Sequence, residues 1–524
     1  MPWHLQQTGF ALVRRRRSEY VPTCNGAVSY RKRCIATGSR LPLTVELDGR
    51  SLSLEDVVSV ALRNEEVALA AGIRERMQAH REVVLAALSR GDQVYGLTTG
   101  VAERKRITLR VDDRVRFNRS ILRTHRVAQG PAASVAQVRA TLLVLANVFA
   151  IGVSGVRPEL ADLLVEALRQ QVEPPVRTLG SIGEADLGPL ADLANWVVEW
   201  AGYELEENEG LALIDNNAFS TGCSALAVFR AEQLLDTMDL AAALDFEAFA
   251  GNVASLHPVV AETRHSPGVS KSLSNVRKAL AGSVLWEVGV ARNLQDPLTF
   301  RCVPQVHGAA RDAISYAREV VERELNSSQG NPVVVLSEQS VVSVGNFDVV
   351  AMSAAVDFAR IGLAPAATSA AERTVKMLQS PFSGLPAGLS DQPETGDDGL
   401  AEMAVAAQSF AAEARLLAQP VSYELVSSTK ADGIEDRTTM APLSARRLDE
   451  VVSLICRLVA VEMTVASQAI DLRQIGRLGR GTAIAYGVVR THVPATAEVP
   501  SLPADLEPLV DAVRKGEFSA TVRE

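Results

Sequence analysis

Two carboxylates stand two residues apart in a glycine-punctuated turn near the middle of the sequence. The stretch LGSIGEADLGPLADLANWV (Leu179–Val197) passes through Gly180 and Gly183 to Glu184 and Asp186, and an apolar run follows. When carboxylates lie close together, the pKa of one of them rises and that group can act as an acid. Because loops on a rigid scaffold present such side chains, this turn is a candidate site of acid–base chemistry.

Long helices must position this turn. Residues 218–244 are apolar on nearly every side, which is typical of a helix enclosed by others. Residues 309–325 and 448–472 keep an apolar stripe at helical spacing. A short strand at residues 43–47 precedes a helix that starts behind Ser53, with a capping-box-like acid three residues on. We expect an all-α fold with a long central helical bundle and small irregular or short β elements near the N-terminal part.

Composition limits the class of protein. The chain has 524 residues, of which 47% are hydrophobic and only 5% aromatic, so a large helical core is expected. Its net charge of -9 argues against nucleic-acid binding, and no apolar run reaches the length of a membrane span. The five cysteines lie far apart and form no CxxC pair, which predicts a reduced, cytoplasmic compartment.

Three regions are predicted along the chain. Residues 1–42, which include the run Arg14–Arg17, lack periodicity and are expected to be a disordered extension without a signal peptide. Residues 43–480 form the expected helical domain. Residues 481–524 are expected to be a C-terminal tail that packs on this domain or extends from it.

The usual cofactor and metal motifs do not occur. The sequence contains no Walker P-loop, no dinucleotide GxGxxG after a strand, no HExxH and no GxSxG nucleophile elbow. None of the seven scattered histidines pairs at i,i+4, so we expect no metal site.

Ten loop motifs, taken together and in order, resemble those of the aromatic amino-acid ammonia-lyase and aminomutase family. The likeness runs from about Leu43 to about Leu472. It implies a helical bundle of the ammonia-lyase (fumarase/aspartase-like) type, a small-molecule substrate, and a homotetramer whose active sites are completed by loops from neighbouring chains. The motifs are VYGLTTG (94–100), RTHRVAQG (123–130), GVSGVRPEL (152–160), GSIGEADLGPL (180–190), EGLALIDNNAFST (209–221), QDPLTFRCVPQVHG (295–308), ELNSSQGNPVV (324–334), VGNFD (344–348), SGLPAGL (383–389) and GIEDRTTM (433–440).

The resemblance also implies a prosthetic group, 4-methylidene-imidazole-5-one, which the family forms from an internal Ala-Ser-Gly. In this sequence Glu184-Ala185 stands where that triad belongs, one residue is missing, and Ala185 has no hydroxyl to eliminate. From these residues we expect no cofactor. Further departures are Asp215 in place of an asparagine and Asp348 in place of a histidine.

The resemblance assigns roles to other residues. Tyr95 matches the tyrosine thought to remove a β-proton, and since an unperturbed tyrosine has a pKa of about 10, the site would have to lower it. Arg301 matches the arginine that forks onto the substrate carboxylate. The predicted catalytic residues are Tyr95, Glu184 and Asp186. The predicted substrate-binding residues are His125, Asp215, Gln295, Arg301, Gln305, Asn331, Asn346, Phe347 and Glu435.

Three functions remain open at this stage. The favoured one is a lyase-type enzyme that eliminates or adds a group next to an acidic C–H of a carboxylate-bearing small molecule without the prosthetic group, in secondary metabolism. The second is a conventional aromatic amino-acid ammonia-lyase, such as histidine ammonia-lyase. The third is a non-catalytic relative that binds a ligand or a partner.

Overall fold

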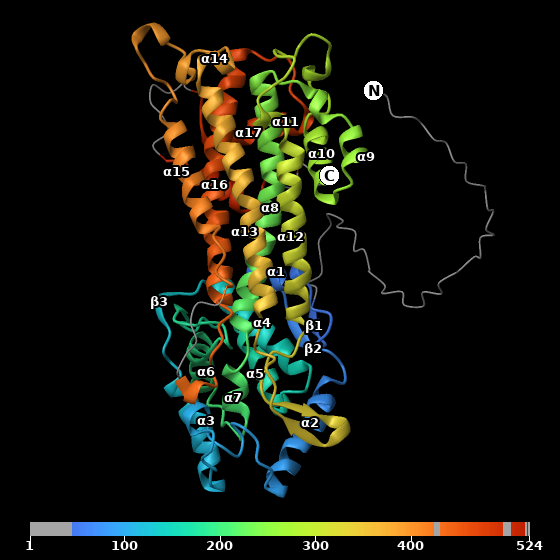
Figure 1. Cartoon of the computed structure of the whole chain (residues 1–524), viewed down its shortest axis with the longest axis vertical. Helices are drawn as coiled ribbons and strands as arrows, with labels where there is room; N and C mark the ends of the chain where they lie inside the picture. Colours follow the sequence, from blue (N-terminus) through green and yellow to red (C-terminus); the bar gives the residue numbers. More distant parts are fainter. Residues whose placement is uncertain (1–43, 424–429, 496–504, 519–520, 522–524) are drawn as a thin grey trace, which may run out of the picture. The chain divides into compact units, whose positions relative to one another are not determined.

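The computed structural model describes residues 44–423, 430–495, 505–518 and 521, and the predicted N-terminal extension lies outside them. Four long helices run side by side and form the core of the described chain (Figure 1). This confirms the all-α prediction. The four helices are α8 (Ala218–Phe249), α12 (Val303–Leu325), α13 (Val350–Leu378) and α16 (Ala441–Arg473).

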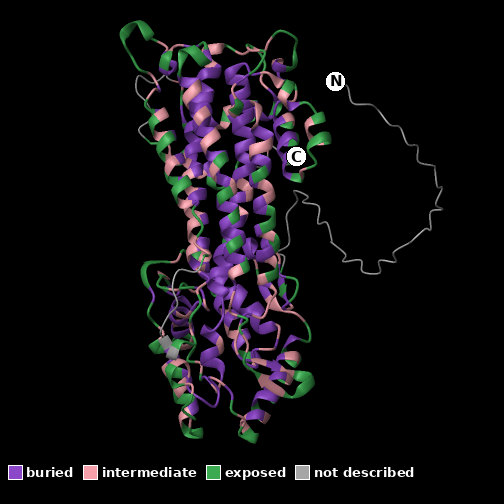
Figure 2. Ribbon diagram, viewed as in Figure 1, coloured by how far each residue is buried: buried purple, intermediate pink, exposed green. Residues whose placement is uncertain are grey.

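Helix α8 is the axis of the bundle. It packs against α16, α12 and α4 (Val135–Ala150), and nearly all of its 32 residues are buried (Figure 2). Its apolar surface on every side is explained by this enclosure, because each face meets another helix. The sequence prediction for residues 218–244 is therefore confirmed, and the helix continues for one further turn.

Buried ion pairs fix the register of the core helices. Arg373 of α13 donates to Asp245 of α8 (2.8 Å) and to Glu462 of α16 (2.6 Å), and all three side chains are buried. On another face of α8, Asp239 accepts from His307 Nδ1 (2.9 Å). Unpaired charges in such a core would be costly, so these contacts specify which residues of neighbouring helices lie side by side.

Shorter helices cover the bundle along its length and at its ends. Helix α13 is long and apolar enough to cross a membrane by composition, yet here it packs against α12 and α16. The remaining α-helices are α1 (Leu54–Arg63), α2 (Ile73–Arg90), α3 (Val111–Thr124), α5 (Pro158–Arg169), α6 (Leu187–Ala201), α7 (Glu209–Ile214), α9 (Val259–Arg264), α10 (Pro267–Ala279), α11 (Leu298–Arg301), α14 (Ser380–Ser383), α15 (Met403–Leu417), α17 (Arg480–His492) and α18 (Glu507–Arg514).

Within the described residues, the strands form only small two-stranded ladders. Strand β1 pairs in parallel with β2, and the two other ladders are antiparallel. The predicted capping box is confirmed, because Ser53 and Asp56 bond to each other's backbone at the start of α1. The strands are β1 (Val45–Leu47), β2 (Val67–Leu69), β3 (Gln129–Ala132), β4 (Arg177–Leu179), β5 (Val333–Val335) and β6 (Ser340–Val342).

Two helices lie where the sequence predicts a tail. Helix α17 packs on α8 and α16, and α18 packs on α16. The apolar positions of α18 that make this contact are Leu509, Val510 and Val513, which are buried.

Candidate active site

The predicted site residues fall into two groups at opposite ends of α8. At the first end Ser220 contacts Asp186, and at the other end the Phe249 ring stacks on Phe300 at 4.3 Å between centroids. These two α8 residues are 29 positions apart, which corresponds to about 44 Å along a helix. Figure 1 shows α6 and α7 at the first end and α11 at the other.

The acidic end, as we call the first end, holds most of the predicted residues. It is built from the loop after α2, the turn before α6, the end of α7, the segment before β5, the loop before α13 and the segment before α16. The predicted residues there are Tyr95, His125, Glu184, Asp186, Asp215, Asn331, Asn346, Phe347 and Glu435.

The glycine turn is held from both sides. Gly183 has a φ of 86°, and its carbonyl accepts from Asn217 Nδ2 (3.0 Å) and from Thr439 Oγ1 (2.7 Å). A Cβ on Gly183 would collide with Thr439 Oγ1 and lie 2.8 Å from Ala441 N. Only glycine fits this left-handed, crowded position. The turn therefore links the start of α8 to the start of α16.

Asp186 anchors the turn to α8. Its Oδ2 accepts from the Ser220 amide (2.7 Å) and the Ser220 hydroxyl (2.8 Å). Complete burial raises the pKa of Asp186 to about 6, while the hydrogen bonds from Ser220 and Ser181 oppose that rise. These two hydrogen bonds hold the turn in place, while the other oxygen, Oδ1, is buried without a hydrogen-bond partner in the described part of the chain.

Asp215 lies at the end of α7 and has fewer partners. Burial raises its pKa to about 7, a hydrogen bond from the Asn331 side chain opposes the rise, and the neighbouring charge of Glu435 adds to it. Asn331 Oδ1 accepts from Val344 N (2.8 Å), so its amide nitrogen is the donor to Asp215. The pKa of Asp215 therefore lies well above that of an exposed carboxyl group.

Tyr95 stands beside these two carboxyl groups. Its hydroxyl oxygen accepts from Ala102 N (2.9 Å). Burial raises its pKa, the Ala102 hydrogen bond opposes the rise, and the charges of Asp215 and Glu435 add to it. The role that the resemblance gives to Tyr95 needs a lowered pKa. In the described chain burial and the charges of Asp215 and Glu435 raise the pKa of Tyr95 instead.

The loop that carries Glu435 is fastened to its neighbours. Arg437 Nε donates to Asp348 Oδ2 (2.9 Å), and Lys105 Nζ donates to the Ala431 carbonyl (2.9 Å). Glu184 forms a backbone bridge with Asp348. These contacts tie the segment before α16 to the loop after α2 and to the loop before α13, and tie that loop to the glycine turn.

The remaining predicted residues of this end lie on its margin. His125 caps α3, and its Nδ1 is 2.8 Å from the Ile121 carbonyl. Phe347 is half-buried and Asn346 is exposed. Arg126, the neighbour of His125, contacts Asp192 of α6 at 3.3 Å.

The arginine end, at the other end of α8, holds the three other predicted residues. Arg301 Nε donates to the Asp296 carbonyl (2.7 Å), and among the described residues its two terminal nitrogens have no hydrogen-bond partner. Gln305 Oε1 is buried, also without a partner in the described part of the chain. Gln295 is exposed. The terminal nitrogens of Arg301 therefore offer the hydrogen-bond donors that suit a carboxylate.

Several residues that shape the site were not singled out from the sequence. Ser220 and Asn217 lie in the DNNAFST motif and Thr439 lies in GIEDRTTM, so the motifs contained a signal for them. Lys105 lies between two motifs, so no motif indicated its role.

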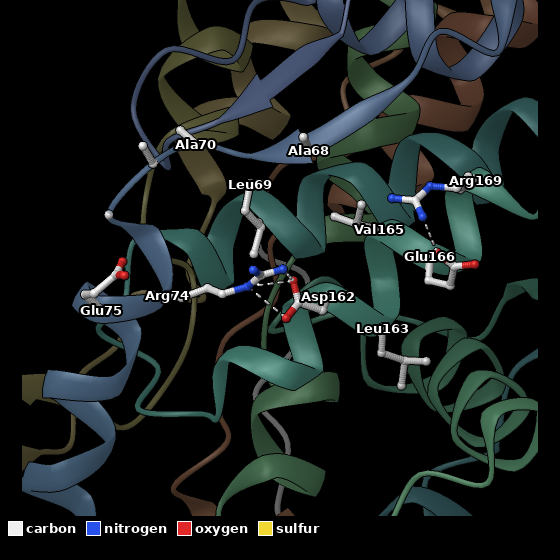
Figure 3. A pocket seen from close by; sticks show the side chains of 12 residues that line it. Ala68, Leu69, Ala70, Arg74, Glu75, Asp162, Leu163, Val165, Glu166 and Arg169 are labelled. Atoms are coloured by element: carbon white, nitrogen blue, oxygen red, sulfur yellow. Dashed lines mark hydrogen bonds and ion pairs between the residues drawn. The ribbon is translucent and has the colours of Figure 1, made fainter.

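A separate cavity of about 730 Å³ lies between β2 and α5 (Figure 3). The ion pairs Arg74–Asp162 (2.5 Å) and Arg169–Glu166 (2.9 Å) line it. None of the predicted site residues contributes to it. Among the residues that the structure describes, no group of three or more His, Cys, Asp or Glu side chains is arranged to hold a metal ion.

Comparison with known proteins decides the family. The family model described as aromatic amino acid lyase matches residues 52–200 and 196–491. The chain belongs to the aromatic amino acid lyase family. Histidine ammonia-lyase of Stigmatella aurantiaca is 32% identical over 502 residues, covering 91% of this chain and 98% of its own. The corresponding protein of Sorangium cellulosum is 33% identical over 510 residues, covering 91% and 98%.

Solved structures agree with this assignment. The ergothionase of Treponema denticola, solved with desmethyl-ergothioneine sulfonic acid, has a TM-score of 0.83 and 27% identity, covering 92% of this chain and 99% of its own. The tyrosine aminomutase of Streptomyces globisporus has a TM-score of 0.83 and 28% identity, covering 92% and 98%. Membership of the family supports an ammonia-lyase-like activity.

The expectation that the chain has no cofactor is corrected by these matches. Histidine and phenylalanine ammonia-lyases carry the methylidene-imidazolone group, and the chain matches that family over most of its length. The expectation rested only on the alignment of residues 180–190 with the family motif, whereas the family model matches most of the chain. The structure places Glu184 and Ala185, rather than Ala-Ser-Gly, at the centre of the turn.

Proposed function

We propose that this protein is a carbon–nitrogen lyase that eliminates an amine from, or adds it to, a carboxylate-bearing small molecule next to an acidic C–H. The observation that carries the proposal is that the two ends of the bundle hold different kinds of polar side chain. One end of the bundle gathers carboxyl groups that can exchange protons, and the other presents an unengaged guanidinium edge. An amino acid needs both kinds of contact.

Six of the predicted residues have a direct role in this proposal. The terminal nitrogens of Arg301 donate two hydrogen bonds to the substrate carboxylate, with Gln295 and Gln305 beside it. Glu435 holds the amine, and Phe347 packs on the substrate side chain. Tyr95 faces the reacting carbon, where the resemblance gives it the role of base.

The proposal requires more than one copy of the chain. Because about 44 Å of helix separates the two ends, one copy cannot place Arg301 and Asp215 on the same small molecule. We therefore propose a homotetramer in which the arginine end of one copy meets the acidic end of another. The far-apart cysteines support a cytoplasmic location, and the departures from the family motifs favour a role in secondary metabolism.

A conventional histidine ammonia-lyase is the second candidate. The names of the relatives that are 30–33% identical favour it. In that reading His125, at the margin of the acidic end, lies near the substrate imidazole.

Amine release tests the proposal. The purified full-length chain is incubated with each common amino acid, and ammonium and the unsaturated acid are measured by mass spectrometry. We expect both products in equal amounts from at least one substrate, loss of both in Arg301→Gln, and no change in Asp162→Asn, whose carboxylate lies in the separate cavity. Absence of both products with every substrate would reject the lyase assignment.

A further inference from the structure

The outer side of α3 carries a row of arginines. Arg116, Arg119 and Arg123 are exposed, and their spacing of three and four residues places them on one side of the helix. The opposite side is buried through Ile121 and Leu122, among others. We call these three exposed arginines the basic face.

The positive charge around the basic face is not neutralised within the described residues. Residues 104–126 contain nine Lys or Arg residues and only two Asp. Asp113 accepts from both Arg110 (2.7 Å) and Arg116 (2.6 Å), so one carboxylate serves two cations. Arg123 has no acidic partner in the described part of the chain. An excess of positive charge therefore remains here, although the net charge of the whole chain is -9, and it attracts an acidic surface.

The loop that precedes α15 has the opposite charge. Residues 377–414 contain no Lys or Arg. The acidic loop, as we call residues 391–398, holds Asp391, Glu394, Asp397 and Asp398, of which the first is half-buried and the others are exposed. Across the described residues, none of these four acids has a cationic partner. The Ser390 hydroxyl donates to Asp397 Oδ2 (3.0 Å), and the Leu400 amide donates to the Gly388 carbonyl (2.7 Å), so the loop is held in shape.

The basic face and the acidic loop lie at opposite ends of the bundle. Helix α3 belongs to the acidic end, because Asn118 Oδ1 accepts from the Gly210 amide of α7 (2.8 Å). Helix α14, which precedes the acidic loop, belongs to the arginine end. There Arg473 donates to the Ser383 carbonyl (2.7 Å) and to the Ala248 carbonyl near the end of α8 (2.8 Å). Figure 1 shows α3 and α14 at the two ends, so the two charged surfaces of one copy cannot meet.

We propose that the acidic loop of one copy binds the basic face of a second copy of this chain. This inference rests on the proposed function, in which the arginine end of one copy meets the acidic end of another. The two surfaces have complementary charges and lie at the two ends that a shared site would bring together. Two basic faces, or two acidic loops, would repel each other, so the contact also selects which ends meet.

A carbodiimide cross-link tests the contact directly in the full-length protein. The reagent joins an amine to a carboxylate without a spacer, and Arg123→Lys supplies the amine while keeping the charge. We expect a cross-linked peptide that joins position 123 to the acidic loop, in a product of twice the mass of the chain. As a control, Arg74→Lys should cross-link to Asp162 within one copy, because Arg74 and Asp162 form an ion pair (2.5 Å).

Reversal of charge gives a second test, read by sedimentation velocity at low salt. Arg116→Glu with Arg123→Glu, and separately Asp397→Arg with Asp398→Arg, should each weaken association at least about tenfold, because like charges then face each other. All four substitutions in one chain should restore association to within about threefold of the wild type. Arg74→Glu with Arg169→Glu reverses two exposed arginines of the separate cavity and should leave association unchanged.

Three results would overturn the proposal. They are a monomeric wild type, an assembled protein in which position 123 forms no cross-link to the acidic loop, and association that neither charge reversal weakens. The proposed function fails by a different result, which is that the wild type releases no amine from any amino acid. A cross-link without amine release would therefore reject the function and support the contact.

Discussion

Complementation between two inactive variants tests whether one site is built from two copies of the chain. Asp215→Asn removes a buried carboxyl group of the acidic end, and Arg301→Gln removes the carboxylate anchor of the arginine end. Each variant alone is expected to be inactive. Asp215 and Arg301 lie at opposite ends of α8, separated by about 44 Å of helix, so no small molecule contacts both residues within one copy.

The size of the restored activity follows from counting. If each site takes its acidic end from one copy and its arginine end from another, random mixing in equal amounts gives both ends intact with a probability of about one half times one half. We expect about a quarter of the wild-type rate per site. If both ends of a site came from the same copy, every site would carry one defect and nothing would be restored.

The assay uses co-expression of two differently tagged chains, followed by measurement of amine release. A matched control co-expresses Asp215→Asn with Glu435→Gln, two variants of the same end, and should show no restoration. Activity of the first mixture at or below the sum of the separate variants would refute the shared site.

Three further predictions concern the scaffold and the buried charges. Gly183→Ala forces a side chain into a left-handed position against Thr439 and Ala441, so calorimetry should show a loss of at least about 2 kcal/mol; an unchanged melting temperature would contradict the described turn. The raised pKa of Asp215 makes its contribution to stability largest below pH 4 and lost as pH rises to about 7. Relative to Asp215→Asn, wild type should therefore lose up to about 4 kcal/mol between pH 4 and pH 8, and a gain over that interval would reverse the sign of the argument. Arg373→Met leaves Asp245 and Glu462 buried without their cation, so urea unfolding should show a loss of about 3–5 kcal/mol, and a loss below 1 kcal/mol would show that the pairs contribute little.

The long helices were predictable because their signals are local. The enclosure of α8 follows from apolar residues on all its faces, and α1 begins where Ser53 and Asp56 form a capping box. The ten motifs predicted the family, which the matches confirm. The helices α17 and α18 were harder to predict, because a proline-containing stretch at residues 494–503 interrupts their pattern.

The assembly of the site was less predictable because its contacts join distant segments. Thr439 meets Gly183 across 256 positions, and although both residues lie in motifs, the motifs do not indicate that the two are in contact. The direction of the Tyr95 pKa shift depends on which charges surround the ring, and these come from Asp215 and Glu435. The prediction that no cofactor is present failed because it used one short motif and disregarded the rest of the chain.

A crystal structure of the assembled protein with a bound amino-acid analogue tests the central claim most directly. The account predicts that the carboxylate of the analogue lies about 3 Å from the terminal nitrogens of Arg301 in one copy. Its amine-bearing carbon should lie against Asp215 and Glu435 of another copy. An analogue held entirely within one copy, or in the cavity between β2 and α5, would contradict the account.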